Sequence, residues 1–279
     1  MKNIRISLIA AFYKDLTALE LIINSLKKQN YNNFELIVAE DNDDPATREF
    51  LGTIKNIDII HTSQADQANR KARSINNAIL ASTGDYLVFI DADCIPCKNF
   101  LHAHASLAEA GKVLSGRRVN LGPRMSNLLR SRKLSIQTVE NYYLFFAPLL
   151  LLDDATHIDQ GLYFNPQGWF YQNVISKRKR SNLGLLGCNY SCFRKDMIEI
   201  DGYDECYGGT AVADDTDLQW RFSKLGLKMK SCKMAANVYH LHHGDGHRTP
   251  TTPIEVALME SRKAAGDYHA HTGLKSHQT

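Results

Sequence analysis

The sequence predicts an α/β protein with a mostly parallel sheet flanked by helices and an elaborated second half. Over the first hundred residues, apolar runs typical of buried strands alternate with segments of helical periodicity. This order of elements builds a parallel sheet with right-handed crossovers. The chain has 279 residues, of which 44% are hydrophobic and 23% charged, so it can bury a large core.

The elements of the first hundred residues have clear local signals. Asp15 is placed to cap a helix whose apolar residues continue at helical spacing to Leu26. Pro45 suits the first turn of a short helix, and a helix over about residues 67–81 ends before Gly84. The strands expected between these helices are Ile4–Ala10, Phe34–Ala39, Ile57–Ile60 and Tyr86–Ile90.

Beyond residue 97 the pattern loosens, although strands and helices still alternate. The expected strands are residues 112–119 and 228–239, and residues 183–193 are expected to return to the core. The expected helices are residues 98–110, 214–225 and 253–265. Residues 124–150 predict one or two helices, residues 153–183 a mobile polar loop region, and the last residues through Thr279 a frayed end. We find no internal repeat or low-complexity linker and therefore expect one domain over residues 1–279.

The charge of the chain favours a small anionic ligand over nucleic acid. The net charge is +3 and the pI is near 8.4, which is too mildly basic for a nucleic-acid-binding protein. Basic residues nevertheless gather at residues 117–133 and at Lys177–Arg180. Each stretch is either a solvated surface or a contact for phosphates or an anionic membrane surface.

Two features bear on the location of the protein. The N-terminus enters a strand without a charged-then-apolar signal segment, so six cysteines predict reduced thiols in the cytoplasm. The longest apolar run, Tyr142–Leu152, is too short to cross a bilayer, which takes about 20 residues. It predicts either a core helix or a peripheral contact with the inner face of the membrane.

The tripeptide Asp91-Ala92-Asp93 is the strongest chemical signal in the sequence. It follows the buried strand expected at Tyr86–Ile90, and ligands of open α/β sheets bind outside the carboxyl ends of strands. Carboxylates at that position can hold a hard divalent cation, which can hold a pyrophosphate. The alternative is a solvated strand end.

Two neighbouring segments carry residues that suit the same sheet edge. Glu40-Asp41 ends the second strand, where a carboxylate can accept a hydrogen bond from a nucleobase N–H or cap a turn. Lys71 and Asn76 belong to the helix before the fourth strand. A cation on that helix either approaches a diphosphate or lies on a solvated face.

The second half adds a group of acids and a group of histidines. Asp214-Asp215-Thr216-Asp217 opens a predicted helix, whose dipole stabilises carboxylates. One of these acids can act as a general base toward a hydroxyl, since N-capping accounts for only one of the three. Three histidines, His240, His242 and His243, stand at the end of a predicted strand. A metal-ligand role and a structural role are equally expected for this group.

Several enzyme classes lack their motifs here. After the first strand the chain reads Ala10-Ala11-Phe12-Tyr13, not Gly-x-Gly-x-x-Gly, and neither a Walker loop nor a Gly-x-Ser-x-Gly elbow is present. Structural zinc would suit Cys94 with Cys97 or Cys188 with Cys192, but each pair stands alone.

In this order the motifs resemble those of the family-2 inverting glycosyltransferases, which have the Rossmann-like GT-A fold. The resemblance covers roughly residues 4–245, and the later half is similar to the galactosyltransferase-type C-terminal region of some members. The matching segments are Ala11–Tyr13, Glu40-Asp41, Lys71–Asn76, Asp91-x-Asp93, Gly187-x-Asn189-x-Ser191-x-x-Arg194, Gly202–Glu205, Asp214–Leu218 and His240. The chain departs from the family in having Glu40 for Asp, Asp214 for Glu and Ala10-Ala11 for Pro-Thr.

The resemblance implies a metal-dependent transfer of a sugar from a nucleotide-sugar, with UDP expected, to an acceptor hydroxyl in glycan or cell-surface polysaccharide synthesis. Residues 1–120 would bind the donor, residues 121–245 would form the acceptor and catalytic half, and residues 246–279 would form a C-terminal helix and tail. The acceptor would be a glycan or a lipid-linked molecule.

The resemblance also implies roles for individual residues. Donor contacts would come from Ala11, Tyr13, Glu40, Asp41, Lys71, Asn76 and Asp91. Mn²⁺ or Mg²⁺ would lie on Asp93 and His240, with His242 the less favoured histidine. Asp215, beside Asp214, would be the general base, and acceptor contacts would come from Gly187, Asn189 and Trp169.

Two other functions stay open at this point. A sugar nucleotidyltransferase would need a glycine-rich loop with Arg or Lys after the first strand, which this chain lacks. A non-catalytic nucleotide- or carbohydrate-binding module would have no use for a general base at Asp215 or for the histidine group.

Overall fold

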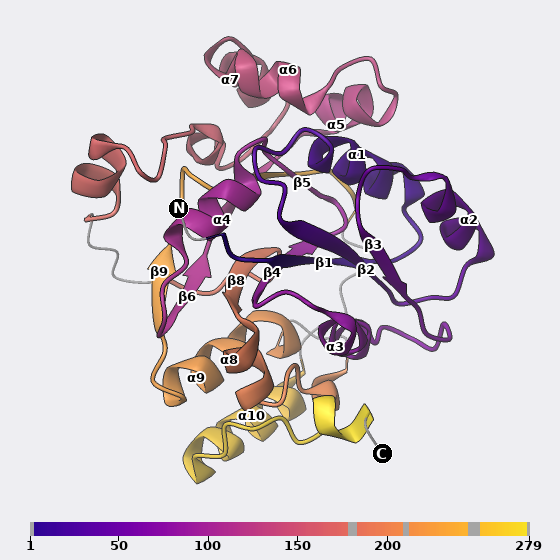
Figure 1. The fold of residues 1–279 in the computed structure, drawn as a ribbon, viewed down its shortest axis with the longest axis vertical. Coiled ribbons are helices and arrows are strands. Elements are labelled where there is room, and N and C mark those ends of the chain that lie inside the picture. The colour runs from indigo at the N-terminus through magenta and orange to yellow at the C-terminus, as the bar shows by residue number, and fades with distance from the viewer. Residues whose placement is uncertain (1–2, 178–182, 209–211, 245–251, 278–279) are drawn as a thin grey trace.

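The molecule, shown in Figure 1, is built on two sheets. It is a computed structural model that describes residues 3–177, 183–208, 212–244 and 252–277, without the side chains of residues 213 and 214. The larger sheet has seven strands in the order β3-β2-β1-β4-β8-β6-β9, and the smaller has three in the order β5-β10-β7. The expected α/β class with a mostly parallel sheet is confirmed.

The strands of the larger sheet are β1 (Ile6–Phe12), β2 (Phe34–Glu40), β3 (Ile59–Thr62), β4 (Tyr86–Asp91), β6 (Lys112–Ser115), β8 (Asn189–Phe193) and β9 (Lys228–Ser231). Those of the smaller sheet are β5 (Cys94–Pro96), β7 (Arg117–Asn120) and β10 (Asn237–His240). In the larger sheet, β8 runs antiparallel to both of its neighbours, β4 and β6, while the other pairs are parallel.

Helices cover both faces of the larger sheet (Figure 1). They are α1 (Leu16–Leu26), α2 (Pro45–Thr53), α3 (Lys71–Ala81), α4 (Phe100–Leu107), α5 (Pro123–Arg130), α6 (Ile136–Asn141), α7 (Tyr143–Leu151), α8 (Arg194–Glu199), α9 (Asp217–Lys224) and α10 (Pro253–Ala265). Successive strand residues point to opposite faces, so Val88 packs in the core with α1 and α4, whereas Phe89 packs in the core with α3, α8 and α9.

The carboxyl ends of β1, β2 and β4 meet at one edge of the sheet. Ala11 pairs with Ala39 on one side and with Asp91 on the other. The backbone N–H of Asp41 then donates to Phe12 O at 2.9 Å, and that of Ala92 donates to Ala11 O at 2.9 Å. The segments that follow β2 and β4 therefore begin side by side at this edge.

The antiparallel strand β8 brings a third segment to the same edge. Asn189, its first residue, pairs with Ile90 near the end of β4. Because β8 runs against β4, the residues just before Asn189 lie beyond the carboxyl end of β4. Gly187 is thereby placed near Asp91, the last residue of β4, and Asp93, which follows it.

Two stretches that the sequence predicts as single strands each divide into two strands of different sheets. Residues 112–119 divide at Gly116, where an added Cβ would lie 2.3 Å from the Asn189 side chain, so only glycine allows this close approach. Residues 228–239 divide in a turn at residues 232–236, where Met234 has a φ of 60°. Both breaks carry the chain from the larger sheet into the smaller one.

Several helices differ from the expected boundaries: α4 and α9 are each shorter than expected. The α3 helix begins at Lys71 instead of residue 67, because Arg70 N donates to the Asp41 carboxylate at 2.7 Å outside the helix. Residues 124–150 hold the three helices α5, α6 and α7. The expected loop of residues 153–183 contains a 3₁₀ turn at Ile158–Gly161 and a π-helical turn at Tyr171–Ile175, and residues 178–182 lie outside the described part.

The C-terminal segment is packed, and the expectation of a frayed end is wrong through His277. Leu274 is buried. The His277 ring lies 2.8 Å from Asn77 Oδ1 through Nδ1 and 2.5 Å from Glu205 Oε1 through Nε2. These contacts tie the segment to α3 and to the turn after α8.

Glu140 on α6 makes the stability of the fold depend on pH. One carboxylate oxygen accepts from Lys98 N at 3.2 Å, and the other is buried with no hydrogen-bond partner among the described residues. Burial, opposed only in part by this hydrogen bond and the Lys98 charge, raises the pKa of Glu140 to about 7. The folded protein therefore keeps a proton on Glu140 between about pH 4.5 and 7, where the unfolded chain loses it, and stability falls as pH rises through this window.

Glu140→Gln is expected to stabilise the protein by about 1–3 kcal/mol at pH 8 and to have little effect at pH 4. Denaturant unfolding of both proteins over this pH range measures the difference. The exposed Glu199→Gln on α8 is the matched control and should show no such pH dependence. A Glu140→Gln effect that is equal at both pH values would contradict the assignment.

Candidate active site

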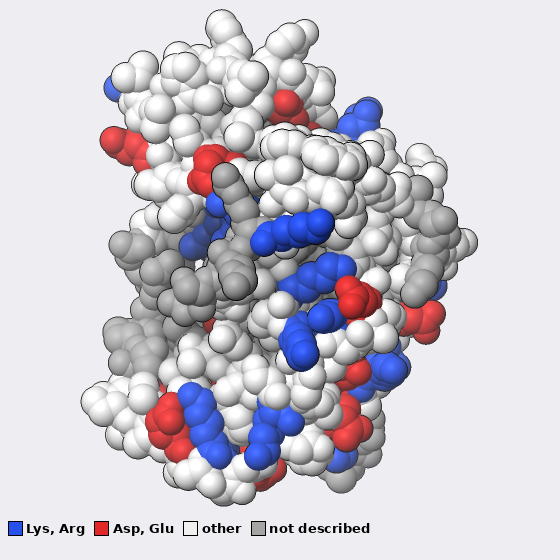
Figure 2. All heavy atoms as spheres, turned by 90° about the vertical axis from the view of Figure 1, so that its left-hand side faces the viewer, with Lys and Arg blue, Asp and Glu red and all other residues white. Residues whose placement is uncertain are grey.

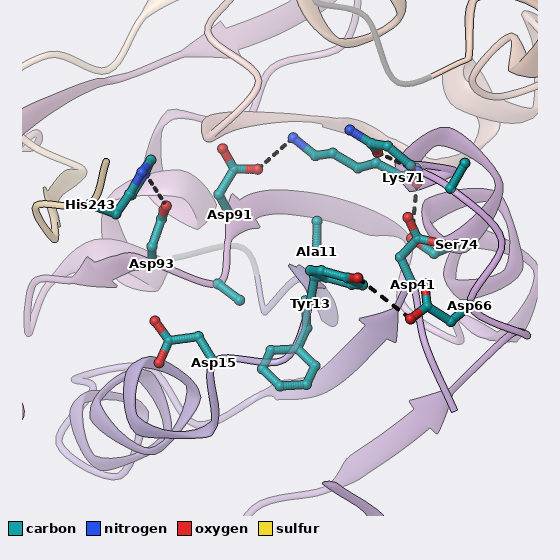
Figure 3. Close-up of a pocket in the computed structure, with 14 residues that line it drawn as sticks. Ala11, Tyr13, Asp15, Asp41, Asp66, Lys71, Ser74, Asp91, Asp93 and His243 are labelled. Atoms are coloured by element: carbon teal, nitrogen blue, oxygen red, sulfur yellow. Dashed lines mark hydrogen bonds and ion pairs between the residues drawn. The ribbon is translucent and has the colours of Figure 1, made fainter. Parts of the chain in front are cut away.

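A cleft of about 460 Å³ opens at the edge where β1, β2 and β4 end (Figure 3). This volume is typical of small-molecule sites. Its lining residues are Ala11, Phe12, Tyr13, Asp15, Asp41, Asp66, Ala68, Asn69, Lys71, Ser74, Asp91, Ala92, Asp93 and His243. Most of the expected donor contacts therefore lie together here, with Asp93 beside them.

One end of the cleft gathers metal-ligating side chains around Asp93. Asp93 Oδ2 lies 3.3 Å from His240 Nε2 and 3.0 Å from His243 Nε2, and the two ring nitrogens lie 3.2 Å apart. The Cys94 thiol donates to Asp93 Oδ1 at 3.3 Å, and ligand atoms of Asp93, Cys94 and His240 all lie within 4.8 Å of one another. One carboxylate and two imidazoles in contact are a donor set that suits Mn²⁺ and related divalent cations.

The charge state of Asp93 fits this role. Burial would raise the pKa of Asp93, but hydrogen bonds from His240 and His243 and the charges of both rings outweigh burial and hold the pKa far below its ordinary range. The Asp93 carboxylate is therefore ionised at neutral pH.

The smaller sheet brings the histidines to Asp93. Within it, His240 pairs with Cys94 across β10 and β5, and Leu241 N donates to Asp93 O at 2.9 Å. The strand ends at His240, so strand alternation does not continue to His242, which is exposed and outside the donor group. His243 takes the place beside Asp93 that the sequence analysis gave to His242 as the second choice.

Asp91 forms an ion pair with Lys71 inside the cleft. Lys71 Nζ lies 2.7 Å from Asp91 Oδ1, and both side chains are about one quarter exposed. Figure 3 shows Lys71 reaching from α3 across the cleft to Asp91. A positive and a negative group thus stand next to the metal-ligating end.

The opposite end of the cleft carries two further carboxylates, Asp41 and Asp66 (Figure 3). Asp41 accepts from Gln64 Nε2 at 2.6 Å and from Arg70 N at 2.7 Å, and burial raises its pKa despite these bonds. Asp66 is more exposed; its Oδ2 lies 2.6 Å from Lys14 Nζ and 3.5 Å from the Tyr13 hydroxyl. Asp66 sits in the coil between β3 and α3 and has no sequence signal of its own.

Two residues expected to contact the donor are fully buried outside the cleft. Glu40 accepts from Thr47 Oγ1 at 2.9 Å and lies 2.7 Å from His61 Nε2, so it joins β2 to α2 and β3. Asn76 donates to Tyr203 O and Glu205 Oε1, both at 2.9 Å, and accepts from Tyr203 N. Both assignments are corrected, because each side chain is hydrogen-bonded within the protein. Glu40 and Asn76 connect the elements behind the cleft and do not face it.

Asp215 is held at the sheet edge by the segment before β8. It belongs to a π-helical turn, Val212–Thr216, and its Oδ1 accepts from Gly187 N at 2.5 Å. Gly187 precedes β8 at the carboxyl end of β4, as described above. The expected base therefore approaches the same edge as Asp91 and Asp93, while the side chain of Asp214 lies outside the described residues.

The third acid of this group, Asp217, is structural. It is fully buried and accepts from the Tyr207 hydroxyl at 3.1 Å, from Trp220 Nε1 at 2.9 Å and from Arg221 Nε at 2.6 Å. Arg221, also buried, donates in turn to Ile200 O and Gly202 O. This network fixes the start of α9, and hence the turn that holds Asp215.

The expected acceptor residues are not brought together. Asn189 is fully buried and donates to Arg117 O at 2.8 Å and Ala236 O at 2.9 Å, so it connects the two sheets and is corrected to a structural residue. Trp169 is 74% exposed and is not among the residues that line the cleft. Its contact with an acceptor stays a prediction.

Several lining residues are not among the site residues expected from the sequence. Two of them, Asp15 and His243, carry sequence signals that were given another interpretation: a helix cap for Asp15, and membership of the histidine group for His243. Asp15 does cap α1, accepting from Ala18 N at 3.0 Å, but it also forms a two-bond ion pair with Arg130 and faces the cleft. The cysteines of the two pairs considered for zinc are free, and the metal-ligating group found among the described residues includes Cys94 but none of the other three.

Comparisons with known proteins identify the family of this chain. Residues 7–164 match the model of the family "Glycosyl transferase family 2". The "Amylovoran biosynthesis glycosyltransferase AmsB" of Erwinia amylovora is 28% identical over 273 residues, which cover 94% of this chain and 79% of AmsB.

Solved structures share the fold at low sequence identity. S. aureus TarS 1-349 in complex with UDP-GlcNAc has a TM-score of 0.60 at 13% identity over 94% of this chain and 66% of that one. GalNAc-T7 with UDP, GalNAc and Mn²⁺ has a TM-score of 0.61 at 13% identity, over 92% and 48%. The mannosyltransferase PcManGT of Pyrobaculum calidifontis, with GDP-Man and Mn²⁺, has a TM-score of 0.55 at 15% identity, over 88% and 59%.

The family model matches more than half of the chain, and these structures have the GT-A fold expected from the sequence. The finer likeness to a galactosyltransferase-type C-terminal region stays a prediction. A sugar nucleotidyltransferase and a non-catalytic binding module are both set aside, because this chain belongs to glycosyl transferase family 2 and is a GT-A glycosyltransferase.

Proposed function

We propose that the enzyme transfers a sugar from a UDP-sugar to a hydroxyl of a glycan in polysaccharide synthesis, with inversion at the anomeric carbon and with Mn²⁺ or Mg²⁺ as cofactor. The observation that carries this proposal is the cleft itself. Asp93 and two histidines stand at one end, and Asp41 and Asp66 stand at the other. The solved neighbours with UDP-GlcNAc or with UDP and Mn²⁺, and the amylovoran relative, support it.

Asp93, His240 and His243 would hold the divalent cation. When bound, such a cation supplies Lewis-acid stabilisation of the departing diphosphate. The ionised state of Asp93 and the contact of its carboxylate with both rings fit a ligand role. The Cys94 thiol donates to the other oxygen of Asp93 and so orients the carboxylate.

The rest of the cleft would bind the nucleotide. Asp66 would accept the N3–H of uracil with Asp41 beside it, and the half-exposed ring of Tyr13 would pack on the face of the base. Lys71, placed on Asp91, would approach the diphosphate. Residues 1–120 would thus bind the donor, and residues 121–245 would supply the base and the acceptor side.

Asp215 would act as the general base. Its carboxylate takes the proton of the acceptor hydroxyl while the acceptor oxygen bonds to the anomeric carbon. The bond from that carbon to the diphosphate oxygen breaks in the same step, and the diphosphate leaves with the bonding electrons. One displacement inverts the configuration and needs no enzyme nucleophile.

A panel of UDP- and GDP-sugars tests the proposed function. We expect release of free nucleotide from a UDP-sugar that depends on Mn²⁺ or Mg²⁺, and a product of inverted configuration by NMR. Preference for GDP-sugars would overturn the UDP assignment, and a product of retained configuration would overturn the mechanism.

Asp66→Ala tests base recognition. Loss of a charged hydrogen-bond acceptor costs roughly tenfold or more in affinity, so KM for the UDP-sugar should rise by about tenfold with kcat little changed. Steady-state kinetics measure both constants. Asp43→Ala, an exposed acid outside the cleft that pairs with Arg48, is the matched control. An unchanged KM for Asp66→Ala would remove Asp66 from the donor site.

A further inference from the structure

The helix α7 is apolar on every side, yet only part of it is packed. Within Tyr143–Leu151, Tyr143 and Leu150 are buried. Leu144 is 78% exposed, Phe145 72%, and Leu152, just past the helix end, 78%. A helix that is hydrophobic all round belongs in a protein core or in lipid. The exposed side of α7 therefore lacks the apolar partner that its sequence suits.

The apolar surface extends around the helix. Figure 1 places α5, α6 and α7 together above the sheets, and the uppermost surface in Figure 2 is mostly white, with few charged side chains. Other exposed apolar residues of this region are Leu128, Tyr142, Leu149 and Leu151. Over residues 134–152 the single charged residue is Glu140, which is turned into the protein. Apolar surface gathered in this way marks an interaction site.

Cations stand at both ends of this apolar segment. Arg132 and Lys133 are exposed and immediately precede it, although Arg132 pairs with Glu20. At its other end, the buried Asp153 accepts from Arg124 N at 3.0 Å, which places the exposed Arg124 beside the end of α7. One exposed acid, Asp154, follows. The Arg132–Glu20 pair cancels, and among the other exposed charged residues named here Arg124 and Lys133 outnumber Asp154. This small excess of positive charge complements an anionic surface.

From these observations we infer that α7 docks the enzyme on an anionic lipid surface. Over residues 142–152 the exposed side chains offer one hydroxyl, that of Tyr142 just before α7, whereas interfaces between proteins carry about ten hydrogen bonds. A lipid surface needs no directional partners, and tyrosine suits its boundary with water. The exposed side of α7 would lie among the acyl chains, while its packed side, with Tyr143 and Leu150, stays against the protein. Among the described residues no helix is long and apolar enough to cross the membrane.

The docking surface, formed by α7 with the exposed apolar residues around it, is linked to the cleft through α5. On α5, Arg130 donates to both carboxylate oxygens of Asp15, at 2.9 and 2.7 Å, and Asp15 lines the cleft. An enzyme docked through α7 would hold the cleft close to the membrane, within reach of a lipid-linked acceptor. This second step rests on the proposed function, whereas the docking itself does not.

Sedimentation with vesicles of phosphatidylcholine, with and without 30% phosphatidylglycerol, tests the inference on the full chain. We expect the wild type to bind the anionic vesicles, and the triple variant Leu144→Gln, Phe145→Gln, Leu152→Gln to bind them at least tenfold more weakly. Ile254→Gln with Val256→Gln, exposed apolar residues of α10, is the matched control and should bind as the wild type does. Arg124→Gln with Lys133→Gln should weaken binding to the anionic vesicles only.

Several outcomes would overturn the inference. They are absence of wild-type binding to anionic vesicles, equal binding by the triple variant, or a dimer in light scattering that the triple variant abolishes without any vesicle binding. Circular dichroism shows whether the triple variant is folded. Turnover with a water-soluble acceptor separates the two proposals: its absence in the wild type counts against the proposed function alone, and its retention in the triple variant confines the defect to docking.

Discussion

Replacing Asp215 by asparagine is expected to lower kcat for sugar transfer by about 10²–10⁴-fold while the enzyme still binds its donor. Asparagine keeps a carbonyl oxygen that can accept from Gly187 N, so the turn before α9 should stay in place. It cannot take the proton of the acceptor hydroxyl. The measurement is kcat under saturating donor and acceptor, together with calorimetric titration of the UDP-sugar.

Asp154→Asn, an exposed acid at the end of α7, is the control for loss of one negative charge. Turnover of Asp215→Asn within a few-fold of the wild type would show that another group removes the proton. Equal losses of turnover and donor affinity would mean that Asp215 supports donor binding instead.

Replacing Asp93 by alanine is expected to weaken Mn²⁺-dependent binding of UDP by at least about 100-fold, since even residues that only orient metal ligands change affinity by about 10–100-fold. The change removes a carboxylate that contacts both His240 and His243. Calorimetric titration of UDP in the presence and absence of Mn²⁺ measures the effect.

Asp43→Ala again serves as control, because this acid lies near the donor end but outside the cleft. Titration heats that are the same for Asp93→Ala and the wild type would remove Asp93 from the metal site. His242→Ala should leave binding unchanged, because that ring is exposed and outside the donor group.

Local sequence signals predicted the half of the fold that is built from neighbouring elements. The strands β1, β2 and β4 follow apolar runs, and their parallel order places Asp41 and Asp91 at one edge. The helix cap at Asp15 and the first-turn proline at Pro45 are both confirmed. These features depend on contacts within a few residues or on the direction of consecutive strands.

The smaller sheet could not be predicted in the same way. It joins β5 and β7 to β10, which is far from both in the sequence, and two segments that were each predicted as one strand had to be divided to form it. The break at Gly116 follows from the closeness of Asn189, a contact that no local pattern reveals. The same long-range pairing decides that His243, and not His242, lies beside Asp93.

Family motifs also predicted polar residues without distinguishing ligands from supports. Glu40, Asn76 and Asn189 occupy motif positions but are fully buried and hydrogen-bonded within the protein. A sequence pattern records that a polar group is needed at a position. Whether that side chain points into the cleft or into the protein behind the cleft depends on how the elements pack.

The position of His277 bears on the order in which the molecule matures during synthesis. His277 bonds to Asn77, which precedes it by 200 residues, and to Glu205, which also accepts from Asn76 on the same helix. That helix, α3, carries Lys71 into the cleft. Although strands β1 to β4 leave the ribosome early, the wall of the cleft formed by α3 gains its outer support only when the residues around His277 emerge.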